Sequence, residues 1–278
     1  MPGIHRSLYQ SFWEHIYRGP KLTRHFASTT AKMTHYPILI TSDIVCPWCY
    51  IGHTRLNKAI EAHKKQYPND TFHLRYLPFY LNPPPQLESN NVPAFPVKSV
   101  NKRDYYAQKF GPERGKQIEE RIVATAAGEG LKFSFGGNTG ISRNGHRLVF
   151  YGQTHGGEEG QNAVMLGLWK RYYEREIDIT TLDTLTEVGV EAGLGTAAEI
   201  REYLESGRDG VEVDRLAEEQ KMNGISGVPN YVLMDTWEIS GAQDPSAFLA
   251  LMKRWKDMEA KGQVNAEETD AAKASACL

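Results

Sequence analysis

The chain has 278 residues, of which 40% are apolar, and a formal net charge of −2. A chain of this length can bury a large core as one domain or as two closely packed ones, and its near-neutral charge gives no reason to expect a nucleic-acid partner. No apolar run is long enough to span a bilayer, so we expect no membrane insertion, and three cysteines are too few for a disulfide-stapled secreted scaffold.

Residues 1–35 have the composition of an organelle transit peptide. A single acidic residue, Glu14, stands against five basic ones in the first 33 positions, and apolar residues recur at every fourth position from Ile4 to Ile16. The basic residues are Arg6, Arg18, Lys21, Arg24 and Lys32. This basic, amphipathic and acid-poor pattern predicts import into mitochondria. The alternative is a disordered tail on a cytoplasmic protein.

A β-α-β pattern opens the folded part of the chain. Residues 36–42 form a short apolar run, residues 50–67 repeat apolar side chains at helical spacing, and residues 71–79 alternate as a strand does. The proline-rich stretch 82–96 then predicts an extended connector.

Helical patterns dominate residues 100–223, and strand patterns return afterwards. Pro112 is placed to start one helix, and residues 196–199 read as a capping box that starts another. Two short strands at 230–234 and 237–240 predict a hairpin, and Asp244 followed by Pro245 predicts the start of a last helix. We therefore expect one α/β domain from residues 36–99 and 224–262, a helical insertion domain from 100–223, and a disordered tail at 263–278.

Cys46 and Cys49 stand where the first strand leads into the first helix. A helix start has unpaired N–H groups and partial positive charge, which favour the reactive thiolate form of Cys46. Cys49, one turn later, is placed to attack a mixed disulfide on Cys46. Pro47 suits the first helical turn, because its missing N–H has no partner to lose there. For Trp48 the sequence leaves two roles open, a partner-binding surface and simple packing.

Two other interpretations of the cysteine pair are weaker. Cys46, Cys49 and His53 could offer three metal ligands, but no second Cys-x-x-Cys or His pair completes a tetrahedral shell, so we expect no metal. The second alternative is that the two cysteines are unrelated buried thiols. The strand before them and the helix after them argue against it, because unrelated thiols would not require that context. A dithiol redox site fits the pattern best.

Several motifs resemble the DsbA-like thioredoxin superfamily, in its FrnE-type branch. They are Ser-Asp-Ile-Val-Cys-Pro-Trp-Cys-Tyr-Ile-Gly at 42–52, Phe-Tyr-Leu-Asn-Pro at 79–83, His-Arg-Leu at 146–148, Gly-Ile-Ser-Gly-Val-Pro at 224–229 and Ser-Gly-Ala-Gln at 240–243. The resemblance implies a thioredoxin-like mixed sheet with a helical insertion. It also implies a disulfide oxidoreductase that exchanges disulfides with protein or glutathione thiols. Such an enzyme needs no bound cofactor, and glutathione would take part as substrate or reductant.

The resemblance also implies roles for residues far from the cysteines. Pro229 is expected in the cis form opposite Cys46 and Cys49, with the backbone of Val228 presented to a bound peptide as an added strand would be. His146 and Arg147 are expected to line the groove above the cysteines and bind an acidic group such as a glutathione carboxylate, with a structural role as the alternative. Pro47 and Trp48 would lie beside the substrate.

Two rival functions stay open at this point. Kappa-class glutathione transferases and hydroxychromene-carboxylate isomerases are similar in architecture, but they typically carry serine where Cys46 stands and lack the second cysteine. The intact pair favours redox chemistry. A non-enzymatic binding module with an apolar groove is the other rival, and no motif specifically supports it. The sequence does not fix the oligomeric state, and a homodimer is one option.

Overall fold

A computed structural model describes residues 33–83, 95 and 97–264 of the chain. Most of the predicted transit peptide, of the proline-rich connector and of the predicted C-terminal tail therefore lies outside the described residues, as does Cys277.

The core is a four-stranded mixed sheet with the order β2-β1-β5-β6. Strand β1 (His35–Ser42) pairs in parallel with β2 (Thr71–Pro78) and antiparallel with β5 (Asn230–Leu233), which forms a hairpin with β6 (Trp237–Ser240). A parallel pair needs a crossover, and helix α2 (Pro47–Gln66) supplies it. The central position of β1 agrees with its almost continuous burial.

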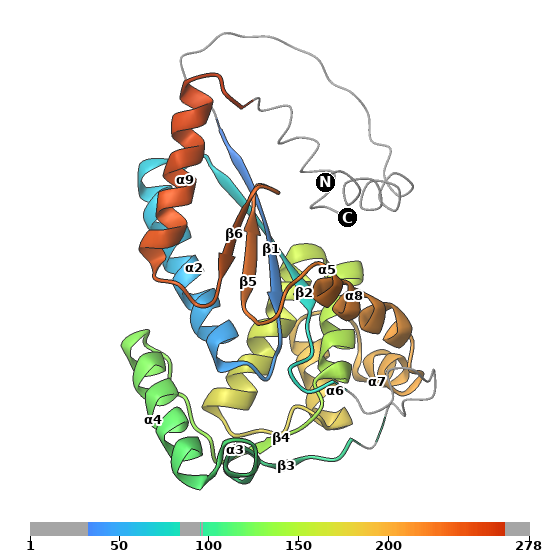
Figure 1. Cartoon of the computed structure of the whole chain (residues 1–278). Coiled ribbons are helices and arrows are strands. Elements are labelled where there is room, and N and C mark those ends of the chain that lie inside the picture. The colour runs from blue at the N-terminus through green and yellow to red at the C-terminus, as the bar shows by residue number, and fades with distance from the viewer. Residues whose placement is uncertain (1–32, 84–94, 96, 265–278) are drawn as a thin grey trace.

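Helices cover both faces of this sheet (Figure 1). Helix α9 (Pro245–Ala260) packs beside α2 on one face, while α5 (Arg143–Trp169) and α8 (Gly210–Met222) contact β2 on the other. Asp244 caps α9 by accepting a hydrogen bond from the Ser246 N–H at 2.9 Å, and Pro245 is its first residue, as predicted.

Between β2 and β5 the chain forms the helical insertion. Its elements are β3 (Val100–Asn101), α3 (Lys102–Phe110), α4 (Pro112–Gly128), β4 (Asn138–Thr139), α5 (Arg143–Trp169), the π-helix η1 (Lys170–Glu174), α6 (Leu182–Glu191), α7 (Ala197–Glu205) and α8 (Gly210–Met222). The predicted capping box of Thr196 and Glu199 starts α7. Within α5 the helix is broken at Gly157, whose φ of 61° is a left-handed value that glycine tolerates. The expected α/β fold with a helical insertion is confirmed.

Aromatic stacking joins the insertion to the first helix of the sheet domain. The Tyr50 ring of α2 stacks on Trp169 of α5 with centroids 5.2 Å apart and planes 13° apart, and on Phe133 at 5.5 Å. The Tyr50 hydroxyl donates to Glu174 Oε1 at 2.6 Å. These contacts attach the first turn of α2 to the end of α5.

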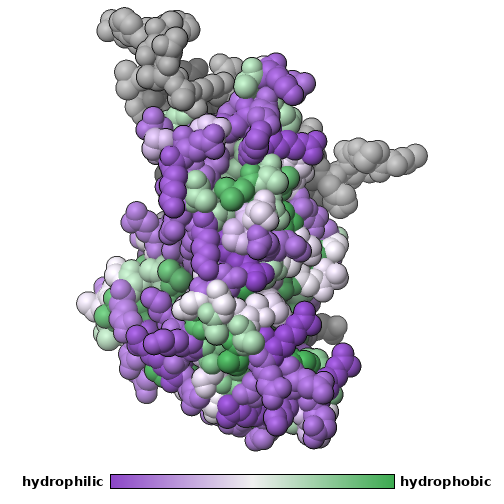
Figure 2. Space-filling view, turned by 90° about the vertical axis from the view of Figure 1, so that its left-hand side faces the viewer, coloured by the Kyte–Doolittle hydropathy of each residue, from purple (hydrophilic) through white to green (hydrophobic). Residues whose placement is uncertain are grey.

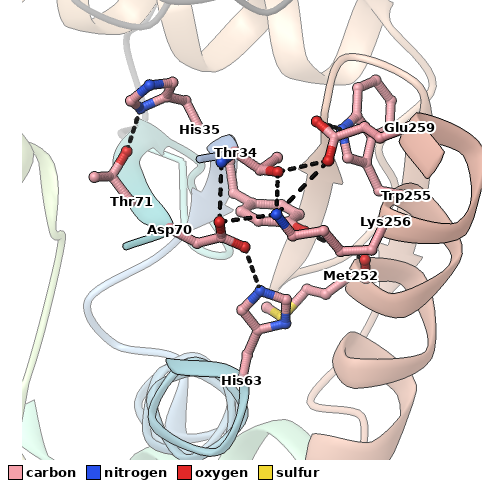
Figure 3. A network of polar contacts seen from close by, with 10 residues as sticks. Thr34, His35, His63, Asp70, Thr71, Met252, Trp255, Lys256 and Glu259 are labelled. Carbon is pink, nitrogen blue, oxygen red and sulfur yellow. Dashed lines mark hydrogen bonds and ion pairs between the residues drawn. The ribbon is translucent and has the colours of Figure 1, made fainter. Parts of the chain in front are cut away.

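A buried polar network ties the far end of the sheet to the last helix (Figure 3). Asp70 Oδ1 accepts from the Thr34 N–H at 2.9 Å and from Lys256 Nζ at 2.8 Å, while Oδ2 lies 2.8 Å from His63 Nε2. Thr34 Oγ1 donates to Glu259 Oε2 at 2.6 Å, and Lys256 also contacts the Thr34 hydroxyl. The start of β1, the start of β2 and the ends of α2 and α9 are thus held by one carboxylate, that of Asp70.

The surface on the α4 and α9 side is mostly hydrophilic, with apolar residues in small separate patches (Figure 2). Across the described ranges no helix combines the length and apolar character that a bilayer crossing needs.

Candidate functional site

Cys46 stands at the start of α2, as the sequence predicts. It is the residue immediately before the helix, with extended backbone (φ −89°, ψ 115°), and Pro47 is the first helical residue. The Cys46 N–H donates to the Asp43 carbonyl at 3.1 Å, and the Cys49 N–H donates to the Cys46 carbonyl at 3.1 Å. The turn therefore puts the first sulfur at the positive end of the helix and the second in its first turn.

The segment that leads into β5 contacts Cys46. The Cys46 thiol donates to the Val228 carbonyl oxygen at 3.5 Å. The peptide bond between Val228 and Pro229 is cis, as the resemblance implies. Two segments separated by 182 residues thus form one site.

Cys46 and Cys49 are both free thiols in buried positions, with exposed fractions of 3% and 2%. Burial raises the pKa of the Cys49 thiol well above its usual range, and its interaction with Cys46 raises the pKa further. Cys49 is therefore protonated until a reaction requires its thiolate. A thiol that stays protonated until then is suited to the second, resolving step of a disulfide exchange.

Asp43 organises the turn that leads to Cys46. Its carboxylate is fully buried and accepts from the Leu81 N–H at 2.8 Å and from the Val45 N–H at 3.3 Å. Oδ1 also lies 3.3 Å from Nε2 of His146, which α5 contributes from the insertion. His146 is itself only 3% exposed, so its ring is buried against the turn that leads to Cys46.

Arg147 differs from its predicted position in the groove. It is fully buried, and its guanidinium donates to three main-chain carbonyls, those of Tyr203 and Leu204 at 3.0 Å and of Arg208 at 2.8 Å. A fourth hydrogen bond reaches Asn144 Oδ1 at 3.0 Å. Because these bonds occupy the guanidinium at the C-terminal end of α7, Arg147 stabilises the insertion and we do not assign it to substrate binding.

His53 is engaged in hydrogen bonds on both ring nitrogens. Nδ1 lies 2.6 Å from the Tyr76 hydroxyl and Nε2 lies 2.8 Å from Asn57 Nδ2. Burial lowers the pKa of His53 to about 4, so the ring is neutral at physiological pH. No group of three or more His, Cys, Asp and Glu side chains within residues 33–83 and 97–264 has a metal-binding arrangement.

Trp48 is half-buried at the rim of the site, next to the insertion. The guanidinium of Arg121, in α4, lies 5.8 Å from its ring centroid, which is cation–π distance. Helix α4 also contacts α2 and shares with α3 an open cleft of about 410 Å³ lined by Tyr106, Gly115 and Glu119, among others. The insertion therefore forms the surface beside Trp48.

Several residues of the site have no signal that sequence reasoning could use on its own. Asp43 precedes Cys46 by three residues, so the sequence itself shows that the two are close. The partner of Asp43, His146, is 103 residues away from it in the chain. Gly52 and Tyr231 lie so close together that a Cβ added at Gly52 would overlap the Tyr231 hydroxyl. An alignment of relatives could expose such pairs, whereas composition and periodicity cannot.

Comparison with known proteins agrees with this geometry. Residues 38–253 match the model of the DSBA-like thioredoxin domain family. The uncharacterized protein YwbO of Bacillus subtilis (strain 168) is 24% identical over 219 residues, which cover 76% of this chain and 92% of YwbO.

Two solved structures share the fold. The probable DsbA oxidoreductase SCO1869 from Streptomyces coelicolor has a TM-score of 0.67 at 26% identity, with 83% of this chain and 92% of that chain covered. A putative protein disulfide isomerase from Nitrosomonas europaea has a TM-score of 0.56 at 16% identity, with 81% and 98% covered. The chain therefore belongs to the DsbA-like thioredoxin family and is a disulfide oxidoreductase of that family.

Proposed function

We propose that the protein exchanges disulfides through the Cys46-Pro47-Trp48-Cys49 dithiol, with protein thiols or glutathione as its partners. The observation that carries the proposal is the placement of two free cysteines on one helix start, with Cys46 beneath the Val228 carbonyl and Cys49 in the first turn.

The exchange takes two steps. The Cys46 thiolate attacks a substrate disulfide R–S–S–R′, forms the mixed disulfide Cys46–S–S–R, and releases R′S⁻, which takes up a proton. Cys49 then loses its proton and attacks the Cys46 sulfur, which releases RS⁻ to be protonated in turn. The two substrate sulfurs gain two electrons and the dithiol loses them. The reverse sequence oxidises a dithiol substrate, and the partner's reduction potential decides the direction.

The main chain around Val228 supports a peptide-like partner. A bound chain can add to the start of β5 as a strand does, with its sulfur beside Cys46. Glutathione presents a peptide backbone and a thiol of the same chemistry, so we include it as substrate or reductant.

Cysteine variants test the proposal. Cys46→Ser should abolish turnover of insulin disulfides and of glutathione disulfide, and Cys49→Ser should accumulate a mixed disulfide that intact-mass spectrometry detects. Cys277→Ser, which changes the third cysteine, is the matched control and should keep full turnover. Turnover that survives in Cys46→Ser would refute the proposal. Glutathione conjugation that survives in Cys49→Ser would favour the transferase or isomerase alternative.

We also propose mitochondrial localisation, on the composition of residues 1–35. A fluorescent protein that carries these residues should colocalise with mitochondria, and replacing Arg6, Arg18 and Arg24 with glutamate should disperse the signal. A diffuse signal from the unchanged fusion would instead favour the cytoplasm.

A further inference from the structure

Tyr231 carries a buried hydroxyl that has no partner. It lies in β5 opposite Ile40 and is fully buried. Its Oη makes no hydrogen bond to any residue in the described part of the chain. A buried hydroxyl without a hydrogen bond is unfavourable, so phenylalanine would serve better here if packing were the only role of the side chain.

The hydroxyl lies against α2 at Gly52, one turn beyond Cys49. A Cβ added at Gly52 would overlap Tyr231 Oη and would lie 3.1 Å from Pro229 Cγ. Gly52 follows Cys49 by three residues, and residues at that spacing share one face of a helix. The phenol oxygen is therefore one turn beyond Cys49, beside Pro229, and the missing side chain at Gly52 makes room for it.

Tyr231 can donate a proton in a hydrogen bond but will not give the proton up. Burial is the main cause that raises the pKa of Tyr231, and the charge of a Cys49 thiolate is the next. Tyr76 and Cys46 act in the same direction, and Arg55 opposes them. The phenol therefore stays neutral, with its O–H available to a nearby anion.

We infer that Tyr231 donates a hydrogen bond to the Cys49 sulfur when that sulfur becomes a thiolate and attacks the mixed disulfide on Cys46. The inference rests on the proposed dithiol exchange and adds a residue to its second step. The attack forms the Cys46–Cys49 bond, breaks the bond from Cys46 to the substrate sulfur, and releases that sulfur as a thiolate, which is then protonated. Tyr231 keeps its proton throughout and lowers the barrier by stabilising the attacking thiolate.

A two-phase thiol titration separates the steps. Reduced full-length protein in a Cys277→Ser background is mixed with one equivalent of 5,5′-dithiobis(2-nitrobenzoate). Attack by Cys46 releases the first thionitrobenzoate, and attack by Cys49 on the mixed disulfide releases the second. In Tyr231→Phe we expect the first phase to stay within about twofold and the second to slow about tenfold or more, the size expected for losing a hydrogen bond to a charged group.

Two other tyrosine variants act as controls. Tyr36→Phe changes a buried tyrosine of the same sheet whose hydroxyl instead donates to the Met252 carbonyl at 3.3 Å, and it should leave both phases unchanged. Tyr173→Phe removes the hydroxyl of a second buried tyrosine that makes no hydrogen bond within the described ranges and responds to the charge of both cysteines. A slowed second phase in Tyr173→Phe, with Tyr231→Phe unchanged, would overturn the assignment.

Stability and the wild-type trace complete the test. Tyr231→Phe should unfold at the same or a higher urea concentration than wild type, because it removes an unpartnered hydroxyl. A second phase that slows only together with a loss of stability would overturn the role in the reaction. A wild-type trace without any second phase would refute the dithiol exchange itself, which is a different outcome from an unchanged Tyr231→Phe.

Discussion

The close approach of Gly52 to Tyr231 gives the sharpest test of the site's packing. In Gly52→Ala, the new methyl group would overlap the Tyr231 hydroxyl and lie 3.1 Å from Pro229 Cγ. Forcing an extra methyl group into a well-packed interior costs about 1 to 3 kcal/mol. Alanine is better than glycine inside a helix by up to about 1 kcal/mol. Taking the full helix gain, we therefore expect a net loss of up to roughly 2 kcal/mol in the free energy of unfolding.

The double variant identifies the atom responsible. Phenylalanine at position 231 lacks the overlapping oxygen, so Gly52→Ala should be neutral or slightly stabilising in a Tyr231→Phe background. Urea unfolding of wild type, both single variants and the double variant gives the coupling energy, which we expect to be at least about 1 kcal/mol. Gly128→Ala is the control, because a Cβ there meets no atom within 4 Å. A coupling energy below about 0.5 kcal/mol, the usual error of additivity, would refute the argument.

Three further variants test buried charges and a buried imidazole. Asp43→Ala removes the acceptor of two main-chain N–H groups and the partner of His146, so urea unfolding should show a loss of about 3 to 5 kcal/mol. Asp70→Ala strips the network around Lys256 and should cost a similar amount, about 3 to 5 kcal/mol, while leaving the rate of Cys46 alkylation by iodoacetamide unchanged. His53 stays neutral in the fold because burial lowers its pKa to about 4 from its usual 6.5. The unfolded chain therefore gains the proton first as the pH falls, and stability is lost between the two values. Between about pH 7.5 and about pH 4.5 the free energy of unfolding of the wild type declines, and His53→Gln should remove roughly 2 to 3 kcal/mol of that decline.

Asp257→Ala is the control for both aspartate variants. Its carboxylate pairs with Lys253 at 2.7 Å on the surface, where the two side chains are 54% and 72% exposed. Exposed pairs of this kind contribute about 1 kcal/mol or less. If Asp43→Ala or Asp70→Ala lost no more than this control, the buried networks would not stabilise the fold as argued. An equally steep pH profile in His53→Gln would contradict the role given to that ring.

Local signals in the sequence predict the ends of elements well. The Asp244 cap with Pro245, the capping box at Thr196 and the helix start at Pro112 all lie where the pattern places them, because each depends on residues within one helical turn. The hairpin was also predicted although its turn lacks glycine. Met234 and Asp235 both adopt positive φ values, of 54° and 50°, which strand pairing on either side enforces.

Contacts between distant segments are what the sequence could not provide. Arg147 belongs to a motif that the family resemblance identifies, yet nothing local shows that its guanidinium turns toward the end of α7. Asn138 and Thr139 form the short strand β4 only through their pairing with β3, and no local pattern predicts that partner. In each case the deciding neighbour lies tens of residues or more away in the chain.

The spacing of the two halves of the site has a consequence for biosynthesis. The ribosome makes Cys46 and Cys49 early, but it adds the Val228 carbonyl that covers Cys46 only 182 residues later. At elongation rates of about 5 to 20 residues per second, the thiols wait roughly 10 to 40 s for the strand that completes their pocket. Throughout that interval the nascent chain carries two sulfurs without their final cover, and these meet whatever redox environment surrounds the exit tunnel.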